Sequence, residues 1–354
     1  MKNESKFIRV FCLSAFVLFG GYFSFFSIIN PYQTSKINIA NKYTPYHLNF
    51  ILHKIRKLTE NKENIQSIIL GSSTSEAFLP ADMKSITGLN TFSASTGGGA
   101  TPVRYTFFKK AIQNLTDLKL IIYVSDLFEF NQPIADAKIS YPMETKNIIQ
   151  KSPFAPSFSD YLKHIFNNQT LEGAFEVLKR TKKNKMTKIL DDGTTTRSMI
   201  LSPVESLNGF EEISPLNQNQ KLLEQIKENT FSYKTNVLFS FTRLNNRITS
   251  LVDEMSKEAE AKKVQMVYIL APYHKLFKDN LFQDDNIKQR YEEWVSYLQS
   301  KSSEYVKICT WPLQSKISSN INSAVWRDGI HFNRKSAIVI AQNCLLMDDS
   351  RSKE

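Results

Sequence analysis

The chain opens with a long uncharged apolar segment, which constrains its fold more than any other feature. No charged residue interrupts the sequence from Val10 to Ile29. A helix of about 20 apolar residues spans the roughly 30 Å hydrocarbon layer of a bilayer, whereas a buried helix of a soluble protein usually keeps a polar side. The segment therefore predicts one transmembrane anchor, residues 10–29, and leaves the rest of the chain to form a separate body.

The charges around this segment predict its orientation. Lys2, Lys6 and Arg9 precede it, and only two lysines occur in residues 30–46. Because cytoplasmic flanks carry the excess of Lys and Arg, we expect residues 1–9 in the cytoplasm and the body beyond the inner membrane, in the periplasm or outside the cell. A cleavable signal peptide is the alternative, but it normally ends at a small-x-small cleavage site, which the residues after Phe25 lack.

The composition of the whole chain is typical of a folded protein. Of its 354 residues, 42% are hydrophobic and 22% are charged, which is enough for a sizeable core. The net charge of +11 suits nucleic acid, anionic lipid or an acidic polymer, and the expected location disfavours nucleic acid. Three cysteines exclude a disulfide framework and a four-cysteine zinc site; at most Cys309 and Cys344 could pair, because Cys12 lies in the apolar segment.

After a linker, residues 30–46, amphipathic helices alternate with short apolar strands. A segment with helical spacing followed by a short apolar strand occurs three times. The helical segments are residues 48–58, 105–115 and 237–255, and the strands that follow them are residues 67–70, 118–124 and 264–270, respectively. Strands that are apolar throughout are typical of a parallel sheet covered on both faces. We therefore predict a three-layer α/β/α domain over residues 47–354.

Residues 131–234 interrupt this pattern with proline, aromatic and lysine-rich segments. A crossover between parallel strands needs far fewer than about 100 residues, so we predict a mostly helical insertion here, with a helix near residues 158–179. Its stretch 178–188 contains six Lys and Arg. That stretch is either a solvated helix end or a surface that contacts anionic lipid or acidic polysaccharide.

Ligands of open parallel sheets bind at the carboxyl ends of the strands, and two of these ends are unusual here. Gly71-Ser72-Ser73 follows the first strand, where a tight turn into a helix would present a serine hydroxyl at the sheet edge. A further strand end is expected at Ser93, and Gly97 and Gly98 lie in the Ser-Thr-Gly-Gly-Gly stretch that follows it, where backbone N–H groups can approach a ligand oxygen.

A third motif lies near the end of the chain, where Asp328 and His331 are three positions apart. At this spacing a carboxylate can fix the tautomer of an imidazole that takes a proton from a serine. Each motif alone is typical of ordinary turns and helix caps, but their joint order predicts a catalytic triad of Ser73, His331 and Asp328.

On these three motifs the sequence resembles the SGNH (GDSL-like) hydrolase superfamily. It is more similar to a membrane-anchored, cell-envelope branch with a Gly-Ser-Ser first block, which includes relatives of the D-alanine-transfer protein of lipoteichoic acid synthesis and polysaccharide O-acetyltransferases. The resemblance covers residues 47–130 and 235–345. It implies acyl-ester hydrolysis or acyl transfer through an acyl-serine at Ser73, an oxyanion hole from Ser73 and Gly98, and no metal or cofactor.

The resemblance also implies a substrate and partners. The substrate would be an acyl ester of an envelope glycan or lipid, and a polytopic membrane acyltransferase is a candidate partner at the inner membrane. Around the serine, the pocket would include Gly71, Ser72, Gly97, Asp126 and His274. His274 follows the strand at residues 264–270, and it either contacts the substrate or is a bystander.

One position departs from the superfamily. Its third block, Gly-x-Asn-Asp, supplies an asparagine donor to the oxyanion hole, whereas the matching strand end here carries Asp126. An ionised carboxylate only accepts hydrogen bonds, and loss of one oxyanion donor costs about 2.7 to 4 kcal/mol of barrier. Asp126 could instead cap the next turn. The departure keeps a second hypothesis open, an inactive scaffold or polysaccharide-binding protein of an envelope complex.

Overall fold

The computed structural model describes the chain in seven ranges: 2–29, 50–97, 101–131, 175, 189–195, 215–318 and 326–346. The chain divides into two compact units, one containing the N-terminal helix and the other containing the sheet.

Helix α1, Lys2–Ile29, contains the predicted membrane segment. Its residues Lys6–Phe25 are long and apolar enough to cross a membrane. Large apolar side chains such as Phe11 and Phe16 are exposed along it, which suits contact with lipid. The prediction of an apolar helix of membrane length at the N-terminus is therefore confirmed.

A five-stranded parallel sheet forms the centre of the body, in the order β2-β1-β3-β4-β5. The strands are β1 (Ser67–Gly71), β2 (Thr91–Ser93), β3 (Leu120–Ser125), β4 (Gln265–Leu270) and β5 (Val306–Cys309). Every residue of β1 and β3 is buried. Because helices cover both faces, these strands are apolar on both sides, and the predicted parallel α/β fold is confirmed.

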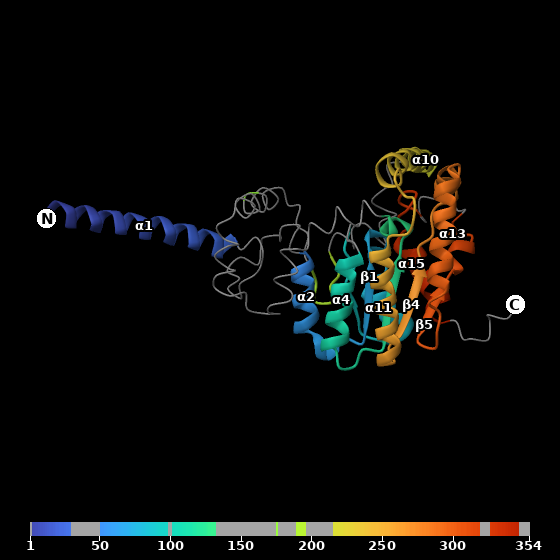
Figure 1. The fold of residues 1–354 in the computed structure, drawn as a ribbon, viewed down its shortest axis with the longest axis horizontal. Helices are drawn as coiled ribbons and strands as arrows, with labels where there is room; N and C mark the ends of the chain where they lie inside the picture. Colours follow the sequence, from blue (N-terminus) through green and yellow to red (C-terminus); the bar gives the residue numbers. More distant parts are fainter. Residues whose placement is uncertain are drawn as a thin grey trace. The chain divides into compact units, whose positions relative to one another are not determined.

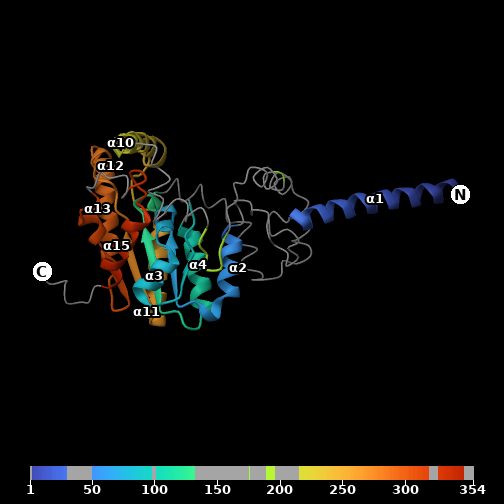
Figure 2. The same ribbon diagram turned by 180° about the vertical axis from the view of Figure 1, so that it is seen from behind.

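Helices cover the sheet in two layers. Helices α4 (Thr101–Asn114) and α11 (Asn246–Lys262) pack together on one face, and α3 (Pro80–Thr87) and α15 (Arg334–Leu345) pack together on the other (Figures 1 and 2). The other helical segments are α2 (Phe50–Glu60), η2 (Lys62–Asn64), η3 (Ser73–Ala77), η4 (Leu127–Phe130), α10 (Pro215–Ser232), η6 (Tyr233–Val237), α12 (Lys275–Leu281), α13 (Asp285–Gln299) and α14 (Trp311–Gln314).

The strand register brings the predicted motifs to one edge. Gly71 of β1 pairs with Val124 of β3, and Ser125 of β3 pairs with Leu270 of β4. The segments that follow β1, β3 and β4 therefore leave the sheet side by side.

One predicted helix begins later than its apolar pattern indicates. The stripe over residues 237–255 predicts a continuous helix, but α11 begins only at Asn246 and residues 233–237 form the π-helical segment η6. The side chain of Asn245 accepts hydrogen bonds from the amides of Arg247 and Ile248, and this cap fixes the start of the helix. The strand predicted at 118–124 is also displaced, to Leu120–Ser125.

Much of the predicted linker and insertion, including residues 30–46, 158–174 and 178–188, lies outside the described residues. Within the predicted insertion, the structure describes an antiparallel bridge between Ile189 and Thr195 and the helix α10.

The two cysteines of the body form a disulfide. Cys309 at the end of β5 is bonded to Cys344 of α15, while Cys12 of α1 is free. The sequence left this pairing open. The bond closes a loop that contains both Asp328 and His331.

Candidate active site

The serine motif lies in a tight turn at the end of β1. A Cβ atom on Gly71 would lie 2.5 Å from the Ser75 side chain and 3.1 Å from the Val124 carbonyl, so only glycine fits. Ser73 is the first residue of η3, a short 3₁₀ helix that stands where the sequence predicts the start of a helix. Such a first residue has no helical partner for its N–H group, and the amide of Ser73 makes no hydrogen bond among the described residues.

The histidine motif is a compact turn between Trp326 and Phe332, which form an antiparallel bridge. The Asp328 carboxylate accepts hydrogen bonds from the amides of Ile330, at 2.8 Å, and His331, at 2.7 Å. These contacts fix the carboxylate on the inside of the turn.

The structure brings Ser73, His331 and Asp328 together. Ser73 Oγ lies 2.8 Å from His331 Nε2, and His331 Nδ1 lies 2.8 Å from Asp328 Oδ2. When Nδ1–H donates to the carboxylate, Nε2 is the unprotonated nitrogen and accepts from the serine hydroxyl. The side chains of His331 and Asp328 are 18% and 15% exposed, so the relay is shielded but reachable. This order of contacts is the geometry of a serine triad.

The environment keeps Asp328 ionised. Burial acts to raise the pKa of Asp328, but hydrogen bonds from the His331 ring and from the two turn amides outweigh it and hold the pKa below its ordinary value. An anionic carboxylate here stabilises the imidazolium that forms when His331 takes a proton.

The loop after β2 is tied to the serine turn. The amide of Thr96 donates to the carbonyl of Gly71 at 3.1 Å. A Cβ atom on Gly97 would lie 3.0 Å from Glu76 Oε1, so the loop passes close to η3. Gly98, the second expected oxyanion donor, lies outside the described residues.

A buried lysine fixes the start of the same loop. Lys54 of α2 donates to the carbonyls of Ser93, at 3.1 Å, and Ser95, at 2.6 Å. Burial lowers the pKa of Lys54 to about 8, although the carboxylates of Glu76 and Asp192 oppose this shift. Sequence reasoning does not find this contact, because a lysine on an amphipathic helix normally faces water.

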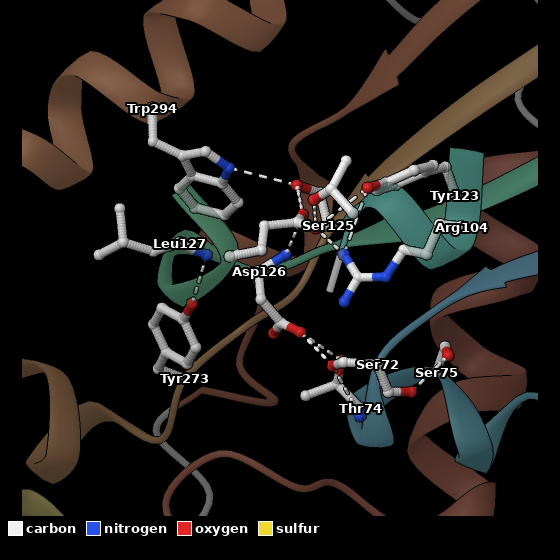
Figure 3. Close-up of polar contacts among 12 residues, drawn as sticks. Ser72, Thr74, Ser75, Arg104, Tyr123, Ser125, Asp126, Leu127, Tyr273 and Trp294 are labelled. Carbon is white, nitrogen blue, oxygen red and sulfur yellow. Dashed lines mark hydrogen bonds and ion pairs between the residues drawn. The ribbon is translucent and has the colours of Figure 1, made fainter. Parts of the chain in front are cut away.

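The Asp126 carboxylate accepts hydrogen bonds from the residues on both sides of Ser73 (Figure 3). Its Oδ2 accepts from Ser72 Oγ and, at 2.9 Å, from Thr74 Oγ1. Asp126 is buried, and its Oδ1 has no hydrogen-bond partner among the described residues. Asp126 is also the residue before η4, as the capping interpretation predicts, but its side chain reaches the serine turn.

A buried polar network fixes the backbone of Asp126 (Figure 3). Glu129 Oε1 accepts from the Asp126 amide at 3.2 Å and from Ser125 Oγ at 2.8 Å. The other oxygen of Glu129 forms an ion pair with Arg104, and both side chains are almost completely buried. Glu129 follows Asp126 by three residues, which is the spacing of a capping box, so this partner could have been found from the sequence.

His274 supports the histidine turn from behind. Its ring is completely buried, its Nδ1 accepts from the Leu276 amide at the start of α12, and its own amide donates to the Gly329 carbonyl at 3.0 Å. Of the two alternatives for His274, the burial of its ring favours a residue that supports the turn over one that contacts the substrate. Of the other pocket residues, Gly71 and Ser72 lie beside Ser73, and Gly97 lies in the adjacent loop.

Within the described ranges, no group of three or more His, Cys, Asp and Glu side chains is arranged to hold a metal ion.

Comparison with known proteins gives remote likenesses. No family model and no curated protein matches the chain. A Bacteroides fragilis structure, provisionally described as an acylhydrolase, is 10% identical with a TM-score of 0.35, covering 79% of this chain and 84% of its own. A Streptococcus pneumonia structure, provisionally described as a platelet activating factor, is 7% identical with a TM-score of 0.36, covering 82% and 88%. Scores this low assign no activity, so the function proposed below rests on the geometry of the site.

Proposed function

We propose that this chain is a membrane-anchored, SGNH-type serine esterase or O-acyltransferase that acts on an acyl ester of a cell-envelope glycan or lipid. The observation that carries the proposal is the relay from Ser73 through His331 to Asp328, with 2.8 Å at each step. Residues from opposite ends of the body form this relay, which makes a chance arrangement of cap and turn residues a poor explanation.

The reaction follows from the positions of these atoms. Ser73 Oγ attacks the ester carbonyl carbon while its proton moves to His331 Nε2. The carbonyl oxygen becomes an oxyanion, which the N–H group of Ser73 can stabilise together with a donor from the loop that contains Gly98. Collapse of the tetrahedral intermediate expels the alcohol, which takes the proton from His331 and leaves an acyl-serine.

The second half of the reaction decides between hydrolysis and transfer. Water attacks the acyl-serine in an esterase, whereas a sugar hydroxyl attacks it in an acyltransferase, and His331 serves as the base for either nucleophile. We favour transfer because an enzyme anchored at the membrane can receive an acyl group from a polytopic membrane partner.

Two features support a location outside the cytoplasm. Lys2, Lys6 and Arg9 lie at the N-terminal end of α1, as expected for a cytoplasmic end. The disulfide between Cys309 and Cys344 is typical of proteins in oxidising compartments. Alkaline phosphatase fused to the C-terminus tests this location, because it is active only beyond the inner membrane; an inactive fusion would contradict it.

Asp126 favours a second candidate function, an inactive scaffold or polysaccharide-binding protein. A buried carboxylate near the site opposes the negative charge of an oxyanion, and Asp126 stands where the superfamily places an asparagine donor.

A fluorophosphonate probe separates the two candidates, because it reacts covalently with an activated serine. We expect the full-length protein in detergent to be labelled at Ser73, with the modified peptide identified by mass spectrometry. Ser73→Ala should abolish labelling, while Ser300→Ala, on the exposed end of α13, should not change it. An unlabelled wild-type protein would reject the enzyme and favour the scaffold.

A further inference from the structure

We infer that Asp126 is a positioning residue that holds the nucleophile segment in its reactive geometry, and that it replaces the superfamily's third-block donor with a different role. This inference rests on the proposed function.

Asp126 contacts both neighbours of the nucleophile. One carboxylate oxygen, Oδ2, accepts from the hydroxyl of Ser72 and from that of Thr74, at 2.9 Å for the threonine. Figure 3 shows the Asp126 side chain directed at this pair. Because a carboxylate only accepts, both hydroxyls must act as donors, and the backbone of Ser73 is tied on both sides to one buried atom.

The two hydrogen bonds to Asp126 position Ser73 through its backbone and not through its side chain. Ser72 Oγ also accepts from the Thr74 amide at 3.4 Å, so the side chains of this turn are linked to one another. Ser73 Oγ is directed to His331 instead. Asp126 therefore does not touch the proton relay, and it sets the place from which the serine hydroxyl and the serine amide face a substrate.

Asp126 is itself rigidly held. Its amide donates to Glu129 Oε1, and Glu129 accepts from Thr101, at 2.8 Å, and from Tyr123, at 3.0 Å. The next residue, Leu127, donates its amide to Tyr273 Oη at 2.9 Å. A clamp fixes a nucleophile only when its own backbone is fixed, and these contacts meet that condition.

The second carboxylate oxygen of Asp126 allows the role of this side chain to be tested by substitution. Oδ1 of Asp126 has no hydrogen-bond partner among the described residues. In Asp126→Asn, the amide oxygen can keep both hydroxyl ties while the NH₂ group occupies the place of Oδ1. In Asp126→Ala both ties are lost, although the hydrogen bond of the backbone remains.

We would compare Asp126→Ala and Asp126→Asn in the full-length protein in detergent. The measurements are the rate constant of fluorophosphonate labelling at Ser73 and the kcat and KM of p-nitrophenyl acetate hydrolysis. Displacement of a reacting group by about 1 Å costs on the order of 100-fold in rate. We expect Asp126→Ala to lose about 100-fold in labelling rate and in kcat with KM unchanged, because the geometry of the nucleophile affects the chemical step. Asp126→Asn should stay within about fivefold of wild type.

Asn245→Ala is the matched control. Asn245 is another buried polar residue, and its side chain caps α11 through the amides of Arg247 and Ile248. The variant keeps the backbone bond from the Asn245 amide to the Phe130 carbonyl of η4. It should lower the melting temperature but leave the labelling rate within about twofold at temperatures below the transition.

Three results would overturn the inference. These are an unchanged rate for Asp126→Ala, equal slowing by Asp126→Ala and Asn245→Ala, and slowing by Asp126→Asn that equals that of the alanine variant. If Asp126→Ala does not fold, Thr74→Val removes one tie and should slow labelling about 10-fold; no slowing would overturn the inference. A wild-type protein that is not labelled at Ser73 would instead reject the proposed enzyme.

Discussion

The buried lysine of α2 predicts an unusual dependence of stability on pH. Lys54 is completely buried, and its pKa is lowered from 10.5 to about 8, chiefly by burial. Below pH 8 the lysine is protonated in both the folded and the unfolded chain, and the folded state bears the cost of the buried charge. Between pH 8 and 10.5 the folded chain loses this proton while the unfolded chain keeps it, so the free energy of unfolding rises with pH.

The size of the effect follows from the shift. One pKa unit corresponds to 1.36 kcal/mol, so a shift from 10.5 to about 8 corresponds to about 3 kcal/mol. Buried tyrosines limit the pH range of the measurement, because burial raises the pKa of Tyr268 and Tyr273 in the folded chain. Above about pH 10 these tyrosines ionise in the unfolded chain only, which stabilises the unfolded state. Up to pH 9.5 the contribution of Lys54 is about 2 kcal/mol.

Urea unfolding at pH 7 and pH 9.5 measures this contribution. The comparison is with Lys54→Met, which keeps most of the side-chain volume and does not titrate. Because the methionine does not titrate, the difference in pH dependence between the two proteins isolates the contribution of the lysine. With a slope of about 2 kcal/mol per molar urea, the wild-type midpoint should rise by about 1 M relative to the variant. Equal pH dependence of the two proteins, or a relative fall of wild type, would refute the reasoning.

Three further predictions concern the triad, the buried ion pair and the disulfide. Asp328→Asn should lower kcat for ester hydrolysis by a factor of about 10³ to 10⁴, because no carboxylate then fixes the His331 tautomer. The circular dichroism spectrum should be unchanged, and a kcat within tenfold of wild type would contradict the triad. Glu129→Gln removes the carboxylate that forms a buried ion pair with Arg104 and should cost about 3 to 5 kcal/mol in urea unfolding. Arg104→Met combined with Glu129→Leu should cost less, and a larger loss in this double variant would argue against this account. Replacing Cys309 and Cys344 by serine removes a disulfide that spans 35 positions and should lower the free energy of unfolding by about 4 kcal/mol. Reductant should not change the stability of this variant further; a variant that reductant does destabilise would show that another bond is involved.

The sequence predicted the parts of the fold that depend on long apolar runs. The strands at residues 67–71, 120–125 and 265–270 are short runs in which every residue except Gln265 is buried, and their length and β-branched residues indicate strands. The edge strand β5 was missed because it is only four residues long and its Lys307 is exposed. A short strand with a polar position gives neither a continuous apolar run nor a clear alternation.

The candidate site was predictable where residue type and order carry the signal. Ser73, Asp328 and His331 have side chains whose chemistry suggests a triad, and the fold places them together. Lys54 and Arg104 could not be found in this way, because their sequence positions are those of ordinary solvent-facing helix residues. Only the packing of α2 and α4 reveals that they are buried.

The order of the site along the chain has a consequence for biogenesis. Ser73 begins η3, directly after β1, while Asp328 and His331 lie beyond β5, with the histidine 258 residues after the serine. In a chain that is synthesised from its N-terminus, the serine is therefore made long before the residues that activate it. If the chain is the proposed serine enzyme, nascent and prematurely terminated molecules lack a complete triad, and activity begins only after the segment that contains Asp328 and His331 has folded.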